Sequence, residues 1–257
     1  MIPTRPARDK ARAARYIRPS MHRPQAILFD LWGTLLNSVA FDPKKGHEAV
    51  LACCDNPRGV SLEKVMDLGR RAVTATIPRE EDSALEFTQF GLLRMVEDAF
   101  ELRPRLGPQE SEWVFWQAAI QVDLIHGVQE LLGALRDLGL PMAVISNSSF
   151  SGATLQRELD RQGIGGFFRF LISSADYGLR KPDPLIFEVA LRRLGMEARQ
   201  VWFAGDHVGY DIIGAHGAGI FPVAFNPRKE VPADVGEHAV LTAWSQLLPL
   251  IASAASA

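Results

Sequence analysis

The segment Phe29-Asp30-Leu31-Trp32-Gly33-Thr34 decides the fold of this chain. It begins where the apolar run Ile27-Leu28-Phe29 ends, and it places the carboxylate of Asp30 directly after that run. A run that is apolar throughout, without alternating polar residues, is typical of a strand buried on both faces of a parallel sheet. Ligands of open parallel sheets bind outside the carboxyl ends of the strands. Asp30 therefore lies where a functional carboxylate is expected.

Similar apolar runs recur along the chain and are separated by helical patterns. Together with the first run they predict five strands, over residues 25–31, 141–146, 167–173, 200–205 and 220–225. Helices are predicted over residues 127–138, 152–162 and 184–194, and each is followed by a Gly, the residue that commonly ends helices. Strands that alternate with helices predict an α/β fold with a Rossmann-like, doubly wound parallel sheet.

Polar residues follow three of the later strands in the same way. Ser146 and Asn147 stand at the end of the second strand, Lys181 shortly follows the third, and Asp206 directly follows the fourth. Because the carboxyl ends of parallel strands lie at one edge of the sheet, these side chains are expected to converge with Asp30. A carboxylate, a hydroxyl, an ammonium group and a second carboxylate would then share one small volume.

Four segments, taken in order, resemble the motifs of the haloacid dehalogenase superfamily of hydrolases. They are Asp30-Leu31-Trp32-Gly33-Thr34, Ser146-Asn147, Lys181-Pro182-Asp183 and Gly205-Asp206-His207-Val208-Gly209-Tyr210-Asp211. Each motif alone is a weak signal, but four in the right order after predicted strands form a strong one. The resemblance covers roughly residues 24 to 225. It implies a hydrolase of the subfamily whose helical cap is inserted after the first motif.

The resemblance implies a role for each matching residue. Asp30 would be the nucleophile, a carboxylate that forms a covalent intermediate. Ser146 and Lys181 would complete the catalytic group by holding the transferring group. The residues expected to bind substrate are Thr34, Asn147, Trp32 and, from the inserted segment, His47. Purely local roles are the alternatives, since Asp often caps turns, Ser caps helices and most lysines are solvated.

A metal site is predicted from the same carboxylates. Asp30, Asp206 and Asp211 would repel one another unless a cation lies among them. Mg²⁺ binds one or two carboxylates together with water and phosphate oxygens, and the backbone carbonyl of Trp32 could also be a ligand. In the family the first Asp of the last motif usually contacts the metal, and the later one often acts behind it. The alternative for Asp211 is to cap the helix that follows it.

Trp32 departs from the common phosphatase pattern. Phosphatases of this family carry a second Asp at this position, where it protonates the leaving group, and an indole cannot do so. Related haloacid dehalogenases have an aromatic residue here, because a halide leaves without a proton. A metal-independent 2-haloacid dehalogenase is therefore the main alternative. Against it, residues 205–211 resemble the metal-binding form, and residues 35–46 lack the Arg that holds halide or carboxylate.

The missing acid leaves three alternatives open. The substrate could carry a leaving group acidic enough to depart unaided, such as an acyl phosphate or a phosphoanhydride. A replacement acid could come from His207 or His47, because the unperturbed pKa of histidine is about 6.5. The third alternative is a domain with weak or lost catalysis that serves binding or regulation.

The inserted segment, residues 40–125, breaks the strand–helix alternation. It predicts an all-α cap of four helices, over residues 46–54, 62–76, 83–100 and 108–122. Residues 24–39 and 126–257 would form the Rossmann-like core. Residues 1–23 hold seven Lys or Arg and one acid, and are expected to be a disordered basic arm.

Composition limits the partners and the location. With 257 residues, 47% hydrophobic residues and a net charge of −2, the chain is of ordinary globular composition. Neither nucleic acid nor a membrane is therefore expected as a partner. The resemblance to the superfamily implies a small phosphorylated or acidic metabolite as the partner. Cys53 and Cys54 are adjacent, so a bridge between them is not expected, and a cytoplasmic enzyme is predicted. It is expected to be a monomer or a homodimer.

Overall fold

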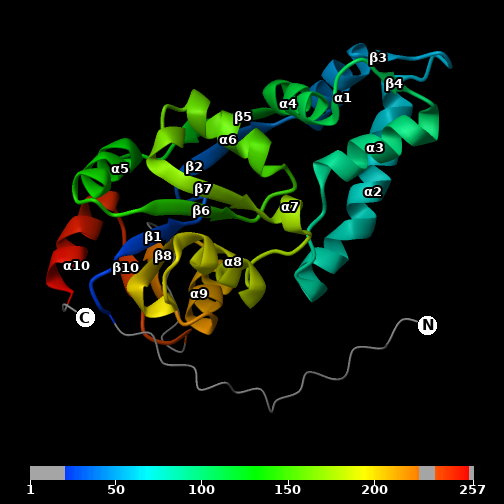
Figure 1. Ribbon diagram of the computed structural model, residues 1–257. Coiled ribbons are helices and arrows are strands. Elements are labelled where there is room, and N and C mark those ends of the chain that lie inside the picture. Colours follow the sequence, from blue (N-terminus) through cyan, green and yellow to red (C-terminus); the bar gives the residue numbers. More distant parts are fainter. Residues whose placement is uncertain (1–20, 226–234, 255–257) are drawn as a thin grey trace.

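The structure, a computed structural model, describes residues 21–225 and 235–254 (Figure 1). Six strands form one parallel sheet in the order β10-β9-β8-β1-β6-β7. These strands are β1 (Ala26–Phe29), β6 (Met142–Ser146), β7 (Phe168–Ser173), β8 (Val201–Gly205), β9 (Phe221–Phe225) and β10 (Ala239–Leu241). The fold is therefore α/β and Rossmann-like, as the sequence predicts.

Helices cover both faces of the sheet, which explains why its central strands are apolar throughout. Ile27 and Phe29 point to the face packed by α5 (Val128–Asp137), α6 (Gly152–Arg161) and α10 (Leu247–Ser253). Ala26 and Leu28 point to the other face, packed by α8 (Pro184–Leu194) and α9 (Ile213–Gly217). Side chains alternate between the faces of a strand, so a strand covered on both sides needs apolar residues at every position.

The predicted strands and helices of the core are found within one or two residues of their expected ends. Nothing in the sequence marks β10, because it has three residues and lies at the edge of the sheet, with Val240 half exposed. The basic arm predicted for residues 1–23 falls almost entirely outside the described residues.

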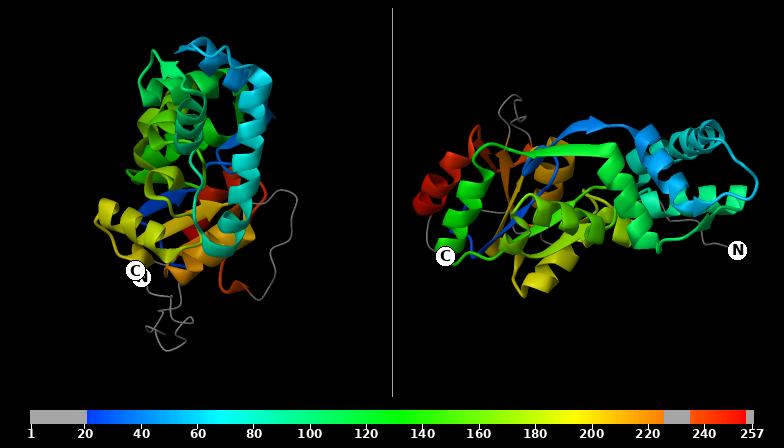
Figure 2. Two further views of the ribbon diagram at one scale, coloured as in Figure 1. Left: turned by 90° about the vertical axis from the view of Figure 1, so that its right-hand side faces the viewer. Right: turned by 90° about the horizontal axis from the view of Figure 1, so that it is seen from above.

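Residues 40–125, which are expected to form a cap and are called the cap below, lie beside the six-stranded sheet and are mostly helical (Figures 1 and 2). The helices are α1 (Pro43–Ala52), α2 (Leu62–Ser83), α3 (Gln89–Phe100) and α4 (Pro108–Ala119). A short antiparallel pair, β3 (Cys54–Asp55) and β4 (Arg103–Pro104), joins two cap loops. An antiparallel ribbon of β2 (Leu36–Phe41) and β5 (Ile120–Leu124) connects cap and core. Within the described residues, no cap strand joins the six-stranded sheet.

The boundary between α2 and α3 differs from the prediction, which started a helix at residue 83. Helix α2 continues through Ser83 and ends at Ala84, whose φ of 53° is left-handed. Helix α3 starts later because Thr88 is its cap: Thr88 Oγ1 accepts a hydrogen bond of 3.0 Å from Gly91 N. Residues between the two helices are thereby free to contact the core.

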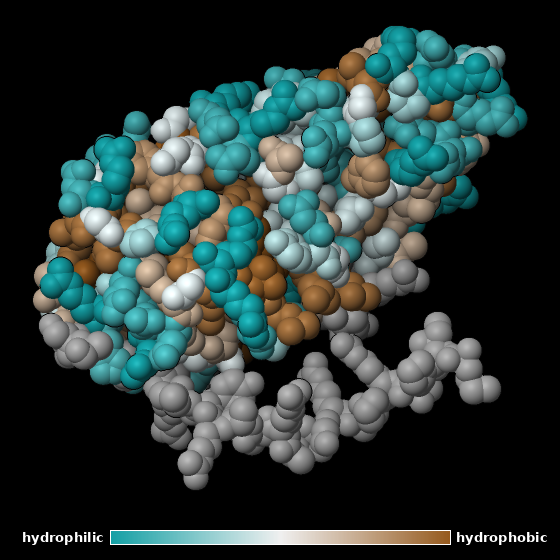
Figure 3. All heavy atoms as spheres, viewed as in Figure 1, coloured by the Kyte–Doolittle hydropathy of each residue, from teal (hydrophilic) through white to brown (hydrophobic). Residues whose placement is uncertain are grey.

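The outer end of the cap is largely hydrophilic, and apolar residues show between polar ones over the core (Figure 3). Over the described residues, no helix has both the length and the apolar character that crossing a membrane requires. Cys53 and Cys54 are unbonded, and Cys54 is buried.

Candidate active site

The carboxyl ends of three neighbouring strands bring the first site residues together. Strand β1 lies between β6 and β8, with Phe29 opposite Val144 and Ala204. Asp30 directly follows β1, and its N–H donates to Ala204 O at 2.8 Å. Ser146 is the last residue of β6, and Asp206 is the first residue after β8. The convergence that strand order predicts is therefore present.

Lys181 is the centre of the charged group. Its side chain is 1% exposed, and Nζ lies 2.6 Å from Asp30 Oδ1 and 2.7 Å from Asp211 Oδ1. Burial opposes its charge, but the two carboxylates outweigh burial and raise the pKa of Lys181 above its usual value. The ammonium group is thus held charged between two carboxylates.

Asn147 fixes the backbone of that lysine. Its Nδ2 donates to Lys181 O at 3.0 Å, and its Oδ1 accepts from Lys181 N at 2.8 Å. Downstream, the Asp183 side chain caps α8 by accepting from Leu185 N at 3.0 Å. The loop after β6 and the start of α8 together position Lys181, so the amide of Asn147, expected to bind substrate, is engaged with protein backbone.

Asp30 is buried and is oriented by two side chains. Oδ1 accepts from Lys181, and Oδ2 accepts from Thr34 Oγ1 at 3.0 Å. Burial raises the pKa of Asp30 to about 6, although the attraction of Lys181 opposes this shift. The hydroxyl of Thr34, another residue expected to bind substrate, thus points to the candidate nucleophile.

Asp30, Asp206 and Asp211 form a cluster that could hold a cation. One oxygen from each carboxylate lies within 4.8 Å of the other two. Two glycines permit this approach: a Cβ on Gly33 would lie 2.5 Å from Asp206 Oδ2, and one on Gly205 would meet the carboxylate of Asp211. The three carboxylates, if ionised, exceed the one ammonium of Lys181 by two negative charges, which favours a bound cation.

Asp211 does not cap the helix that follows it, which was the alternative role considered for it, because α9 has no side-chain cap and Asp211 lies inside the preceding helical turn. Its Oδ2 accepts a hydrogen bond of 2.9 Å from His207 N, at the start of the helical turn Val208–Ile212. Its other oxygen contacts Lys181. Burial raises the pKa of Asp211, while Lys181 opposes the shift. Asp211 therefore contacts Lys181 with one oxygen and holds the backbone of His207, in the loop after β8, with the other.

Ser146 presents a hydroxyl that protein groups leave unused. Its side chain is fully buried, and Oγ makes no hydrogen bond to any residue of the described ranges. Buried polar atoms are nearly always hydrogen-bonded. A hydroxyl in this state, at the carboxyl end of β6, suits the oxygen of a ligand.

Trp32 belongs to an aromatic contact between core and cap. Its ring centroid lies 5.9 Å from that of Trp116 on α4. The ring of Trp116 in turn meets Phe150 edge to face at 4.9 Å, and its Nε1 donates to Glu158 Oε2 at 2.9 Å. The indole of Trp32 thus faces the cap, and it supplies no acid.

The two histidines considered as substitute acids have different surroundings. His47 is 4% exposed inside the cap, edge to face with Phe115 and close to Gly69. Burial lowers its pKa to about 4, so it is neutral near pH 7. His207 stacks on Tyr210, and its Nδ1 accepts from Tyr210 N at 3.1 Å. No described contact connects His47 to the carboxylates.

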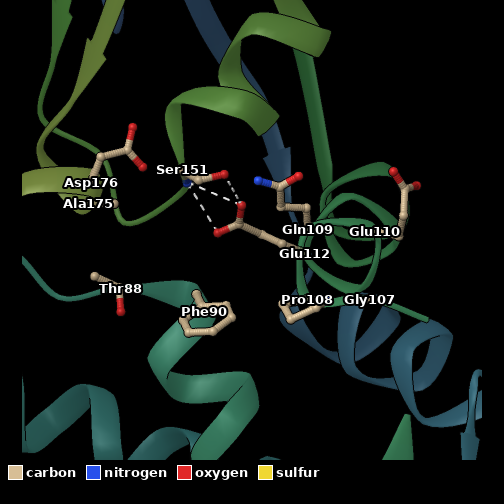
Figure 4. Close-up of a pocket in the computed structure, with 10 residues that line it drawn as sticks. All are labelled: Thr88, Phe90, Gly107, Pro108, Gln109, Glu110, Glu112, Ser151, Ala175 and Asp176. Carbon is tan, nitrogen blue, oxygen red and sulfur yellow. Dashed lines mark hydrogen bonds between the residues drawn. The ribbon is translucent and has the colours of Figure 1, made fainter. Parts of the chain in front are cut away.

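Cap and core are also joined by buried carboxylates that the motifs do not include. Glu112 of α4 accepts from Thr154 Oγ1 at 2.7 Å and from both the N–H and the hydroxyl of Ser151, the cap residue of α6 (Figure 4). Glu86 accepts from Ser174 Oγ at 2.5 Å. Each acid stands in a stretch of mixed polar and apolar residues, so its sequence reveals neither its burial nor its partner.

Next to Glu112 a cavity of about 560 Å³ opens between cap and core (Figure 4). It is lined by Thr88, Phe90, Gly107, Pro108, Gln109, Glu110, Glu112, Ser151, Ala175 and Asp176. None of the motif carboxylates is among these residues. We therefore assign the candidate active site to the clustered carboxylates and Lys181. The cavity is a separate feature.

Residues 24–219 match the haloacid dehalogenase-like hydrolases, and the chain belongs to this family. It is 27% identical over 224 residues to a glyceraldehyde 3-phosphate phosphatase of Methanocaldococcus jannaschii, covering 85% of this chain and 92% of that protein. It is 26% identical over 225 residues to an (S)-2-haloacid dehalogenase of a Pseudomonas species, covering 85% and 90%.

A solved structure resembles the whole fold. The 2-haloacid dehalogenase of Pseudomonas syringae pv. Tomato is superposed with a TM-score of 0.63 at 28% identity, covering 89% of this chain and 98% of that one. The resemblance of the four motifs to this superfamily is thereby confirmed, and the protein is a hydrolase of that family. Phosphatases and dehalogenases are both among its relatives.

Proposed function

We propose that this chain is a Mg²⁺-dependent phosphatase that hydrolyses a small phosphorylated metabolite through an aspartyl-phosphate intermediate. The observation that carries the proposal is the cluster of Asp30, Asp206 and Asp211, in which Asp30 and Asp211 hold Lys181, together with the unpaired hydroxyl of Ser146 at the end of the neighbouring strand. A dehalogenase needs no cation, whereas this excess of carboxylates favours one. A phosphatase and a dehalogenase are similar to this chain at nearly the same identity. The choice between these two activities therefore rests on the residues of the site.

In this mechanism Asp30 forms and then breaks one covalent bond. A carboxylate oxygen of Asp30 attacks phosphorus, and the bond from phosphorus to the leaving oxygen breaks. Water then attacks the same phosphorus, the bond to Asp30 breaks, and the free carboxylate returns with release of phosphate. Thr34 and Lys181 orient the carboxylate, and the hydroxyl of Ser146 donates to a phosphoryl oxygen.

Asp30 and Asp206 would hold the cation, with the backbone carbonyl of Trp32 as a further ligand and Asp211 behind them. Mg²⁺ suits oxygen ligands and, when bound, would neutralise charge on the phosphoryl group. The two glycines that admit the carboxylates support this assignment, since a side chain at Gly33 would displace Asp206.

The leaving group is expected to depart without a proton from the position of Trp32. The aromatic contact between Trp32 and Trp116 keeps that position apolar. His47 is buried and neutral, which makes it a poor acid near pH 7. Acyl phosphates, phosphoanhydrides and aryl phosphates are therefore the favoured substrate classes, because their leaving groups are stable as anions.

One observation favours the second candidate, a 2-haloacid dehalogenase. Trp32 is aromatic, as is the corresponding residue of haloacid dehalogenases. Their leaving group is a halide, which departs without a proton. A dehalogenase is also among the structures and sequences that resemble the whole chain. Asp30 would then attack carbon and not phosphorus, and no cation would be required.

Release of phosphate and of halide over one substrate panel, with Mg²⁺ and with EDTA, distinguishes the candidates. The phosphatase should release phosphate from acyl or aryl phosphates with Mg²⁺ only, and Asp206→Ala should abolish both turnover and Mg²⁺ binding. Halide release that neither EDTA nor Asp206→Ala alters would establish the dehalogenase. A cytoplasmic location, a monomer or homodimer, and no binding to nucleic acid or membranes are part of the proposal, and they rest on the composition.

A further inference from the structure

Two buried polar atoms, one in the core and one in the cap, lack protein partners within the described residues. Ser146 Oγ is at the end of β6, and Gln89 Nε2 is at the start of α3 in the cap. Both residues are more than nine-tenths buried, and neither atom makes a hydrogen bond to any residue within 21–225 or 235–254. A buried donor without a partner destabilises a fold, so such atoms point to a ligand.

Gln89 is a polar residue at an apolar position. It is the first residue of α3, and the buried face of this helix continues through Leu92, Leu93 and Val96. These spacings of three and four residues place all four side chains on one face. Leu92, Leu93 and Val96 pack into the main apolar cluster, whereas Gln89 is at the end of that face nearest the core.

The backbone fixes Gln89 against the active-site loops. Gln89 N donates to Ser149 O at 2.7 Å, three residues beyond Ser146. The segment before it is bound to the loop that carries Lys181, because Arg180 N donates to Ala84 O at 3.0 Å and Leu85 pairs with Leu179. These backbone contacts place Gln89 against both loops, the one that follows Ser146 and the one that carries Lys181.

The side chain of Gln89 is not part of the lining of the separate cavity. Its neighbours Thr88 and Phe90 line that cavity, and Gln89 does not (Figure 4). Because Gln89 is 4% exposed, its side-chain amide is available only to a molecule that the protein encloses.

We propose that Gln89 is a specificity-determining residue, whose side-chain N–H donates a hydrogen bond to an oxygen atom in the leaving group of the substrate. This role rests on the proposed function, in which Ser146 and Lys181 serve the phosphoryl group. The chemical class of substrate is then narrower: a phosphate whose organic part carries a carbonyl, carboxylate or hydroxyl oxygen close to the scissile bond. An unpaired donor discriminates strongly against a substrate that lacks the acceptor.

The test compares Gln89→Met, which keeps the length of the side chain and removes the donor, with the unmodified protein. Acetyl phosphate has a carbonyl oxygen beside the leaving oxygen, and phenyl phosphate has no oxygen outside its phosphate. We expect Gln89→Met to lower kcat/KM for acetyl phosphate about 10- to 100-fold and that for phenyl phosphate less than about threefold. The matched control is Gln156→Met on α6, whose side-chain amide donates to Asp160, and it should change neither value.

A second readout separates substrate binding from a structural role. Because Gln89→Met removes an unpaired buried donor, the urea midpoint of the ligand-free variant should equal or exceed that of the unmodified protein. Three results would overturn the role of Gln89 and leave the proposed function intact. They are a lower urea midpoint, an equal loss of kcat/KM for both substrates, and no loss for either substrate. If the unmodified protein releases phosphate from neither substrate, the proposed function fails first, and the role of Gln89 fails with it.

Discussion

Lys181 Nζ lies 2.6 Å from Asp30 Oδ1, although 151 residues separate the two in sequence. Both side chains are almost fully buried, and Asp211 is the third member of the group. A buried charge is stable only with its partners, so the arrangement links the stability of the core to the reactive carboxylate. The same lysine is therefore expected to affect both folding and turnover.

Lys181→Met should be strongly destabilising. It leaves two buried carboxylates without their cation, at a cost of about 3–5 kcal/mol in the free energy of unfolding. Burial already raises the pKa values of Asp30 and Asp211, and loss of Lys181 raises them further. Protonation then relieves the repulsion, so the loss should be smaller at pH 5.5 than at pH 8. Urea unfolding at both pH values measures it.

The exposed residue Lys64 provides the control for this substitution. Lys64→Met should change the free energy of unfolding by less than about 0.5 kcal/mol at either pH. A loss in Lys181→Met that is as small as in the control, or equal at both pH values, would show that the ion pairs with Asp30 and Asp211 contribute little.

Glu112→Ala should weaken the junction of cap and core. It removes the acceptor of Ser151 and Thr154 at the start of α6, and a lost buried acceptor of this kind costs about 1–3 kcal/mol. Glu110 also bridges to α6, but its ion pair with Arg157 is exposed, so Glu110→Ala should cost less than about 1 kcal/mol. Thermal unfolding of both variants measures the two losses of stability. A larger loss in Glu110→Ala than in Glu112→Ala would contradict the role of Glu112 at the junction of cap and core.

His47 should make the protein less stable in acid. Burial lowers its pKa to about 4 in the folded chain, whereas the unfolded chain has the ordinary value of about 6.5. Between these values the unfolded state binds more protons, so the contribution of His47 is complete above pH 6.5 and is lost as the pH falls to 4. The total loss is on the order of 3 kcal/mol.

Urea unfolding between pH 4.5 and 7.5 tests this effect through its slope with pH. His47→Gln cannot titrate, so the dependence of stability on pH should flatten in this variant. The exposed residue His126 is the control, and His126→Gln should keep the original slope. The same slope in all three proteins would mean that His47 is not buried in the neutral form.

Trp32→Asp should create an acid where phosphatases of the family have one. In the unmodified protein, the rate should depend steeply on the pKa of the leaving group, so that aryl and acyl phosphates react far faster than alkyl phosphates. General acid catalysis contributes about 10²- to 10⁴-fold, and Trp32→Asp should raise turnover of alkyl phosphates by up to that order. Measured rates over a series of leaving groups provide the test.

A flat dependence on the leaving group would indicate a substitute acid. If a bell-shaped pH profile then disappears in His207→Ala, His207 is that acid, and the expectation for Trp32 is wrong. The corresponding result for His47→Ala would be surprising, because that ring is enclosed among the cap helices. Neither outcome would alter the position of Asp30 as the candidate nucleophile.

The fold and the charged group could be predicted because their signals are local. A strand buried on both faces must be apolar at each position, and polar residues such as Asp30 and Asp206 follow where the strand ends. Gly33 also lies within its motif, and its φ of 74° and its contact with Asp206 explain why a glycine is needed there. Short sequence segments therefore identify the residues that converge.

Contacts between cap and core could not be predicted, because they join segments far apart in the chain. Glu112 caps α6 from 39 residues away, and Glu86 reaches Ser174 from 88 residues away. The buried site of His47 depends on how α1 meets its neighbours, and not on its own sequence. Gln89 differs, because it is a polar residue at helical spacing from the apolar residues Leu92, Leu93 and Val96, which marks it as unusual. This pattern can be recognised only when the start of α3 is placed correctly.

The most direct test of the aspartyl-phosphate mechanism is to follow oxygen from the solvent. The protein would turn over acetyl phosphate in H₂¹⁸O with Mg²⁺, and mass spectrometry would then measure the released phosphate and the peptide that contains Asp30. Water that attacks phosphorus labels the phosphate and leaves Asp30 unlabelled, which is the expected result. Label in the Asp30 carboxylate, above all during halide release from a 2-haloacid without Mg²⁺, would mean that water attacks the carbon of an ester, and it would contradict the proposed function.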